Sequence, residues 1–158
     1  MNRATKILQS ISSRQKQIAV LVDPEKSEDE NQLKELLKKC EFAQIDYIFI
    51  GGSTVTRQQF ENTARFIGQN TIIPLVIFPG SAQQLSQDAD ALLYLSLLSG
   101  RNPDYLIEHQ VNAVPILKKT NLEIISTGYI LIESGSETAV ERVSKTKPLD
   151  RNNINYIV

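Results

Sequence analysis

The sequence contains few of the residues that stabilise secreted or membrane-spanning proteins. Its 158 residues include one cysteine, one methionine and no tryptophan. A single cysteine excludes an internal disulfide, and Cys40 lies in a leucine-rich helical pattern where a small buried hydrophobic residue is expected. We therefore expect a reducing, cytoplasmic location.

Long apolar runs are also missing. No stretch is long and apolar enough to cross a membrane, and residues 1–17 are polar with helical periodicity, unlike a signal peptide. An excess of one charge is missing too, because 17 basic and 18 acidic residues give a net charge of -1. This balance offers no basic surface for nucleic acid, so a phosphate-bearing ligand would need a local positive group such as a metal ion, a helix N-terminus or a lysine.

Short aliphatic runs alternate with helical patterns along the whole chain. With 41% hydrophobic and 22% charged residues, the composition is that of one globular domain. Helices are predicted over 28–42, with a capping box of Ser27 and Glu30, and after the caps Thr56 and Asn102, with a short helical stretch following 79–81. The runs predicted as buried strands are 18–22, 47–50, 74–78, 91–95 and a strand that begins at 123. Such alternation without long linkers predicts an α/β fold with a parallel sheet.

Two parallel folds fit this order of elements, an open doubly wound sheet and a TIM (β/α)8 barrel. Five strands would complete a flavodoxin-like sheet. However, residues 129–133 and 138–143 alternate like a β-hairpin beyond the fifth strand, and residues 152–158 resemble the first turns of a helix. A barrel enzyme needs about 200 residues or more. The barrel interpretation therefore makes residues 1–158 the N-terminal portion of a single domain, an incomplete barrel of about five β/α units with a hairpin insertion.

Polar residues and glycines follow the first two predicted strands. The first strand ends in Asp23-Pro24-Glu25-Lys26, and the second ends in Gly51-Gly52-Ser53. Because ligands bind at the carboxyl ends of parallel strands, these ends are expected to meet at one site. A carboxylate and a hydroxyl on adjacent strand ends suit Mg²⁺, so Asp23 and Ser53 are the predicted metal ligands. Lys26 would add positive charge there, and Gly51 and Gly52 would let the backbone approach a bound group closely.

Each of these residues also has a purely structural explanation. Aspartate before proline commonly starts a turn, Gly-Gly-Ser is a common loop, and Lys26 could be a solvated loop residue. Tyr105 and Tyr129 would either line an apolar groove or serve ordinary packing. The only histidine, His109, lies in a helical pattern and is assigned to the surface or the rim of the site.

Five stretches of the sequence, in the same order, resemble the geranylgeranylglyceryl and heptaprenylglyceryl phosphate synthases. They are LVDPEK at 21–26, DYIFIGGS at 46–53, PLVIFPG at 74–80, LSLLSGRNP at 95–103 and STGYIL at 126–131. The resemblance implies a (β/α)8 barrel and a magnesium-dependent prenyltransferase. Such an enzyme joins sn-glycerol 1-phosphate to a polyprenyl diphosphate as an ether and releases pyrophosphate, an early step of ether-lipid synthesis.

The resemblance also implies roles for single residues. Asp23 and Ser53 match the family's magnesium-binding positions, and Lys26 matches the family motif without an equally clear role. Tyr105 and Tyr129 would lie on the wall of a groove for the prenyl tail. By the same resemblance, the protein is expected to form dimers or larger assemblies.

The sequence departs from the family in one respect. Members continue with a segment like Tyr-Leu-Glu-Ala-Gly-Ser-Gly and with Gly-Gly and Gly-Asn loops, which bind glycerol phosphate and supply the expected catalytic glutamate. None of these is present here, so no catalytic residue is assigned. A barrel without its last strands would expose strand edges, and we expect it to be inactive alone. The alternatives are an inactive, truncated remnant that keeps a phosphate or metal site or acts as a binding module, and a complete doubly wound binding domain.

Overall fold

The computed structural model describes residues 6–157 and contains one parallel sheet of five strands. The strands pair in chain order, from β1 to β5, and every neighbouring pair is parallel. Their bounds are β1 Ala19–Val22, β2 Tyr47–Ile50, β3 Leu75–Ile77, β4 Ala91–Leu97 and β5 Glu123–Tyr129. The predicted parallel α/β sheet is thus confirmed. Because the strand order never reverses, the sheet winds as a barrel does and lacks the switch point of a doubly wound fold.

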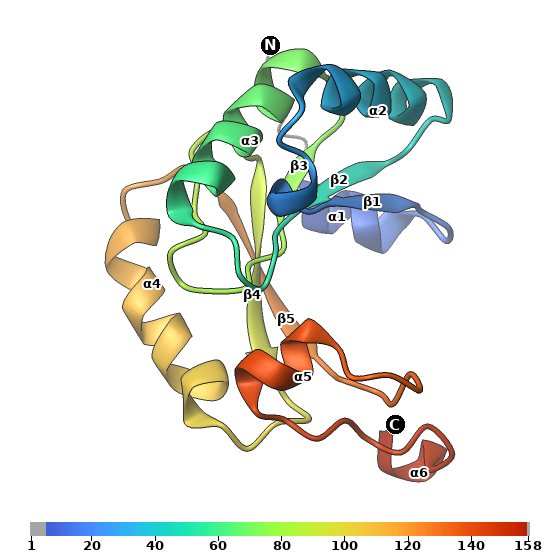
Figure 1. The fold of residues 1–158 in the computed structure, drawn as a ribbon, viewed down its shortest axis with the longest axis vertical. Coiled ribbons are helices and arrows are strands. Elements are labelled where there is room, and N and C mark those ends of the chain that lie inside the picture. Colours follow the sequence, from blue (N-terminus) through green and yellow to red (C-terminus); the bar gives the residue numbers. More distant parts are fainter. Residues whose placement is uncertain (1–5, 158) are drawn as a thin grey trace.

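Helices cover both faces of this sheet (Figure 1). Three of them pack on its outer, convex face: α2 (Glu30–Phe42), α3 (Arg57–Asn70) and α4 (His109–Leu117). The helix α1 (Ile7–Ser13) lies on the opposite face, and α5 (Ala139–Ser144) and α6 (Ile154–Ile157) follow the last strand. Two short turns complete the order of elements, a 3₁₀ turn over Pro24–Lys26 and a π-helical turn over Asp104–Glu108 that leads into α4. No helix in the described part of the chain is long and apolar enough to span a membrane.

Alternate residues of each strand face different layers, which explains the continuous aliphatic runs of the sequence. On the convex face, side chains of the sheet pack against α2, α3 and α4, including Ile48, Ile50, Leu75, Ile77 and Leu92. On the concave face, a smaller cluster packs around α1 and contains Ile7, Tyr47, Val76, Ala91, Leu93 and Ile125. The concave cluster occupies the position of a barrel interior.

Local capping signals were partly correct as predictions of helix starts. The capping box of Thr56 and Gln59 is present and begins α3. The box predicted for Ser27 and Glu30 is wrong. The side chain of Asp29 caps α2 instead, by accepting hydrogen bonds from the N–H groups of Asn31 and Gln32. Asp29 lies directly before the first helical residue, which is the position that a capping carboxylate requires.

Two elements predicted beyond the third strand are wrong. The chain after β3 runs through turns to Asp90, with no helix. The second strand of the predicted hairpin is instead the helix α5, which Thr138 and Glu141 begin with a capping box. The two-residue alternation of 138–143 suggested a strand, but the Thr-x-x-Glu cap satisfies the first N–H groups of a helix and outweighs it.

Helix α1 closes the amino-terminal end of the concave face. Ile7 is only 2% exposed and packs in the concave cluster. The carboxylate of Glu123, at the start of β5, accepts from the N–H of Ile7 at 2.6 Å and from the N–H of Leu8 at 3.1 Å. The Tyr47 hydroxyl donates to the Ser10 hydroxyl oxygen at 2.9 Å. These contacts join the first helix to the second and last strands.

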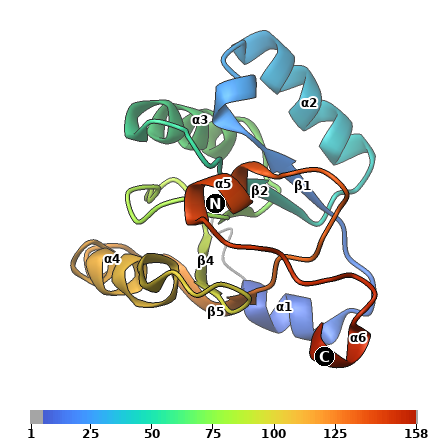
Figure 2. The same ribbon diagram turned by 60° about the horizontal axis from the view of Figure 1, so that its bottom comes forward.

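Within residues 6–157, β1 pairs only with β2 and β5 pairs only with β4. Both outer strands therefore present an unpaired edge, as an incomplete barrel does. Figure 2 shows β1 and β5 apart from each other, with the chain that follows β5 running through the space between them.

The packing of α1 generates the first prediction. Replacing Ile7 by alanine should lower the free energy of unfolding by about 2–5 kcal/mol, because the side chain is removed from a closed apolar cluster. Ile11→Ala, on the exposed side of the same helix, should change the free energy by no more than about 0.5 kcal/mol. Urea unfolding followed by circular dichroism measures both, and equal effects would contradict the packing of α1 described above.

Candidate functional site

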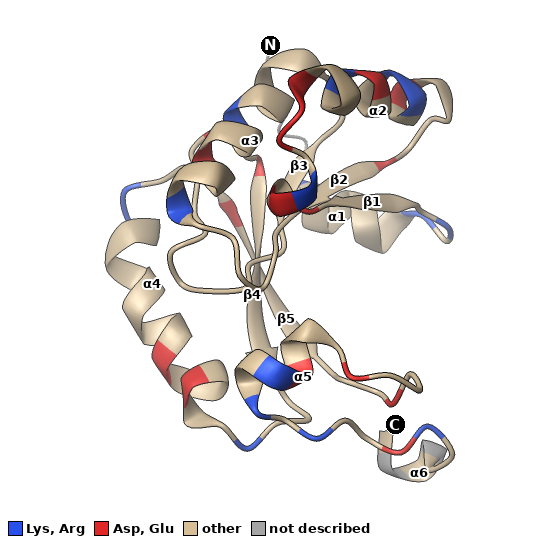
Figure 3. Ribbon diagram, in the orientation of Figure 1, with Lys and Arg blue, Asp and Glu red and all other residues tan. Residues whose placement is uncertain are grey.

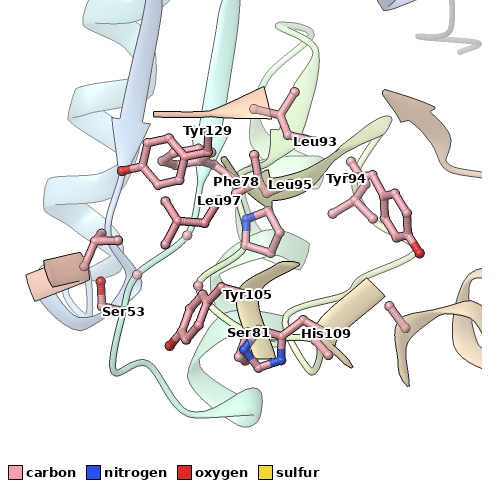
Figure 4. A pocket seen from close by; sticks show the side chains of 18 of the residues that line it. Ser53, Phe78, Ser81, Leu93, Tyr94, Leu95, Leu97, Tyr105, His109 and Tyr129 are labelled. Carbon is pink, nitrogen blue, oxygen red and sulfur yellow. The ribbon is translucent and has the colours of Figure 1, made fainter. Parts of the chain in front are cut away.

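A cavity of about 300 Å³ opens at the carboxyl ends of strands β1 to β4. Figure 4 shows that aromatic and aliphatic side chains form most of its wall. Apolar residues from several elements line it, including Leu21, Phe78, Leu93, Leu95, Leu97, Val140 and Val143. Its polar lining includes Asp23, Ser53, Ser81, His109 and Gln110. The site therefore combines an apolar hollow with a few polar groups, the usual composition of a small-molecule site.

The pairing of β1 with β2 brings Asp23 and the Gly51–Ser53 segment together. Val22 is aligned with Ile50, and the N–H of Gly51 donates to the carbonyl of Val22 at 3.2 Å. Asp23 and Gly51 therefore leave the sheet side by side. The predicted adjacency of the two strand ends is confirmed.

Gly52 allows the Asp23 carboxylate to lie directly against this backbone. A Cβ atom at Gly52 would lie 2.8 Å from Asp23 Oδ1, which is closer than real side chains approach. The same oxygen accepts from the N–H of Glu25 at 3.2 Å, which fixes its direction. The carboxylate is thus held beside the residue that precedes Ser53.

This arrangement fits a magnesium ion in its choice of atoms. Carboxylate and hydroxyl oxygens are hard ligands, and Mg²⁺ commonly takes one or two protein ligands together with waters and phosphate oxygens. In residues 6–157, no group of three or more His, Cys, Asp or Glu side chains is arranged to hold a metal. An ion bound by Asp23 and Ser53 would therefore depend on oxygens of a phosphate ligand and of water. The role of both residues as metal ligands stays a prediction.

Of the two remaining residues predicted to bind substrate at these strand ends, Gly51 lines the cavity and Lys26 lies outside it. Lys26 does not line the cavity: its side chain is 82% exposed, with Nζ 3.7 Å from Asp23 Oδ2. Gly51 lines the cavity, but a Cβ there would lie 1.8 Å from the carbonyl oxygen of Phe78. The close approach that requires glycine at this position is thus to the end of β3, within the protein.

Tyr105 and Tyr129 both line the cavity, as predicted from the groove hypothesis (Figure 4). The ring of Tyr129 packs edge-on against Phe78, with centroids 5.5 Å apart. Burial raises the pKa of Tyr129, and burial followed by the charge of Asp104 raises the pKa of Tyr105. Both phenols are therefore neutral at physiological pH and add no negative charge to the apolar wall.

His109 lines the cavity and is partly exposed, which agrees with its predicted place at the surface or the rim of the site. Its ring packs edge-on against Tyr105, with centroids 4.7 Å apart. The side-chain amide of Gln110 donates to the carbonyl groups of Leu95 and Tyr105 and so joins α4 to β4. Gln110 also lines the cavity and was not predicted from the sequence, because no local motif marks it.

Helix α5 supplies a wall that sequence reasoning also missed. Val140 and Val143 line the cavity three residues apart, on one face of the helix. The Thr138–Glu141 capping signal could have indicated this helix and hence the inward face. The end of α5 is attached to the loop after β4 by a hydrogen bond from the Asn102 side chain to the carbonyl of Ser144, at 3.0 Å.

Charged side chains do not form a surface of one sign near the site. Figure 3 shows acidic and basic residues interspersed along α2 and around α5. Positive potential for a phosphate would therefore come from a bound cation or from single side chains such as Lys26.

Comparison with known proteins finds one matching family and several relatives that share one name. The profile of the PcrB family matches residues 11–157. A protein of Flavobacterium johnsoniae named geranylgeranylglyceryl phosphate synthase is 58% identical over 147 residues, which cover 93% of this chain and 60% of the relative. A protein of the same name from Zunongwangia profunda is 46% identical over 151 residues, covering 96% of this chain and 64% of the relative. The chain thus spans less than two thirds of the length of either.

A solved structure shows the same fold. It is the (S)-3-O-geranylgeranylglyceryl phosphate synthase of Thermoplasma acidophilum in complex with sn-glycerol-1-phosphate. The two structures superpose with a TM-score of 0.86 at 26% identity, and the match covers 99% of this chain and 62% of the other. The incomplete barrel predicted from the sequence agrees with this similarity.

The burial of Tyr129 generates the second prediction. A raised pKa means that the folded state holds the phenolic proton more tightly than the unfolded state. The resulting stabilisation is present below the ordinary phenol pKa of about 10 and is lost as the pH rises through the higher folded value. Tyr129→Phe should therefore make the free energy of unfolding fall less steeply above about pH 10.

Tyrosinate absorbance checks this prediction directly, since the protein has no tryptophan. In the folded protein, Tyr129→Phe should remove a component that titrates above the ordinary value. In urea, where burial is lost, the variant should lose a component with the ordinary pKa. If Tyr129→Phe instead removed a component with the ordinary phenol pKa from the titration of the folded protein, the effect of burial on Tyr129 would be contradicted.

Proposed function

The chain belongs to the PcrB family, and from this we propose that it forms part of a prenyltransferase that joins sn-glycerol 1-phosphate to a polyprenyl diphosphate. The relatives named geranylgeranylglyceryl phosphate synthase support this activity, as does the glycerol phosphate complex of the Thermoplasma acidophilum protein. In the proposed reaction, the bond between the allylic carbon and the diphosphate oxygen breaks. The oxygen of the glycerol hydroxyl forms the new ether bond and gives up its proton to water or to the departing diphosphate, and pyrophosphate leaves.

One observation carries the proposal: Asp23 and Ser53 both line a cavity whose wall is otherwise mostly apolar. A polyprenyl diphosphate has the matching shape, with a charged head and a long hydrocarbon tail. Asp23 and Ser53 would meet the head, while Leu93, Leu95 and Leu97 of the cavity wall would contact the tail. Burial of the tail supplies affinity roughly in proportion to its apolar area.

Asp23 and Ser53 would hold Mg²⁺ together with the diphosphate oxygens. When bound, the ion would neutralise charge on the departing diphosphate. The chain's own contribution is to orient these ligands, since Gly52 and the N–H of Glu25 both fix the Asp23 carboxylate. Lys26, 3.7 Å from Asp23, would add a second positive charge near the departing group.

Tyr105 and Tyr129 would form walls of the prenyl groove. Their raised pKa values keep the phenols neutral, so that the groove stays apolar at physiological pH. Val140 and Val143 of α5 would cover the hollow and exclude water from the reacting carbon. A dry site strengthens the interactions of the charged head.

The alternative function is binding of a magnesium diphosphate without turnover. Both functions use the same Asp23 and Ser53 site and differ in whether ether is formed. The proposal also includes assembly into a homo-oligomer. It includes a cytoplasmic location as well, which the free, buried thiol of Cys40 supports.

The site generates the third prediction, which concerns Asp23. Asp23→Asn keeps an oxygen that can accept from the Glu25 N–H but removes the negative charge. We expect magnesium-dependent ether formation to fall on the order of 100-fold or more. Glu35→Gln removes a carboxylate from the exposed face of α2 and should leave activity unchanged.

The assay uses radiolabelled sn-glycerol 1-phosphate, geranylgeranyl diphosphate and Mg²⁺. It is run with this chain and with the chain extended by the part of the Flavobacterium johnsoniae relative that the match leaves uncovered. Ether formation that survives Asp23→Asn would rule out the proposed metal site. Binding of magnesium pyrophosphate by both proteins, with ether formed by neither, would favour the binding function.

A further inference from the structure

Gln84 is a buried amide in the segment that connects β3 to β4. It is only 2% exposed, and this segment runs through turns where most α/β units have a helix. Its Nε2 donates to the carbonyl oxygen of Gly52 at 2.7 Å, and its Oε1 accepts from the N–H of Gly80 at 2.9 Å. One side chain thus joins the loop after β2 to the loop after β3.

The two loops touch where Gln84 joins them. A Cβ atom at Gly80 would lie 2.3 Å from the Gly52 carbonyl oxygen, so the backbones are in direct contact. Gly52 lies beside the Asp23 carboxylate, since a Cβ there would be 2.8 Å from Oδ1, and Gly52 precedes Ser53. A continuous line of contacts therefore runs from Gln84 through Gly52 to the predicted metal ligands.

A purely structural role for Gln84 would consist of pairing the Gly80 N–H and the Gly52 carbonyl. Burying an amide costs free energy unless its donors and acceptors are paired, and an apolar side chain in a neighbouring position, Leu85, fills the core without that requirement. Gln84 directs both hydrogen bonds to loops that line the cavity. Its two bonds set the direction of the Gly52 carbonyl, and the peptide that contains this carbonyl is bonded to Ser53.

We propose that Gln84 is a positioning residue that fixes the Gly52–Ser53 backbone beside the Asp23 carboxylate and so sets the affinity of the site for a divalent cation with a diphosphate. The inference rests on the proposed function, because it concerns the same site. It adds a residue that does not line the cavity and that acts only through Gly52 and Ser53.

The test measures cation affinity and not turnover. Mn²⁺ replaces Mg²⁺ and is titrated into the full chain with inorganic pyrophosphate, and free Mn²⁺ is followed by electron paramagnetic resonance. Gln84→Met preserves the size of the side chain and removes both hydrogen bonds. We expect Mn²⁺ to bind on the order of tenfold more weakly, the usual effect of losing a group that orients a metal ligand.

Two comparisons separate positioning from general destabilisation. Gln83→Met, at the exposed neighbouring residue, should bind Mn²⁺ as the unchanged protein does. In a Ser53→Ala background, Gln84→Met should weaken binding by much less than tenfold, because the hydroxyl that it positions is already gone. If Gln84→Met fails to fold, Gln84→Asn takes its place, since a side chain one carbon shorter cannot reach both loops.

The outcomes divide as follows. No binding by the unchanged protein, or equal binding by Asp23→Asn, would overturn the proposed metal site and the role of Gln84 with it. Binding that depends on Asp23 but is equal in Gln84→Met and Gln83→Met would overturn only the positioning role. So would a tenfold loss that is the same with and without the Ser53 hydroxyl, because Gln84 would then act on the fold as a whole.

Discussion

Strands β1 and β2 run parallel with Val22 level with Ile50, and this register decides where the polar residues that follow them lie. Since side chains alternate along a strand, a shift of one residue would exchange the two faces of β1 and separate Asp23 from Gly52. The register is maintained by burial, because Val22, Ile48 and Ile50 all pack in the convex core. The geometry of the site therefore depends on apolar packing beneath it.

The loops above that core approach one another more closely than loops usually do. Glycines make this possible: a side chain at Gly51 would meet the backbone of Phe78, and one at Gly52 would meet the Asp23 carboxylate. Close backbone contact leaves carbonyl and N–H groups without water, and each then needs a partner in the protein. Gln84 supplies partners for two of them, and this need explains a buried amide beside an otherwise apolar cavity.

Much of the fold and part of the site could be predicted from the sequence. The five strands, the parallel pairing and the presence of Asp23 and Ser53 at one cavity follow from aliphatic runs and from the rule that parallel strands end at one edge. The predictions of a hairpin after β5 and of a helix after β3 were wrong. The first contains a capping box that outweighs its two-residue alternation, and the second packs residues such as Leu85 at the cavity, where tertiary contacts outweigh the local helical pattern.

By itself, the sequence determined the five strands of the sheet, their order and the polar residues at the strand ends, since these depend on patterns among neighbours in the chain. Only the tertiary structure decided which side chains enclose the cavity and how the site is held in place. Gln84 reaches Gly52 across 32 residues, and Glu123 caps α1 across 116 residues. Contacts at such separations arise from the packing of whole elements, and no local pattern of hydrophobic and polar residues encodes them.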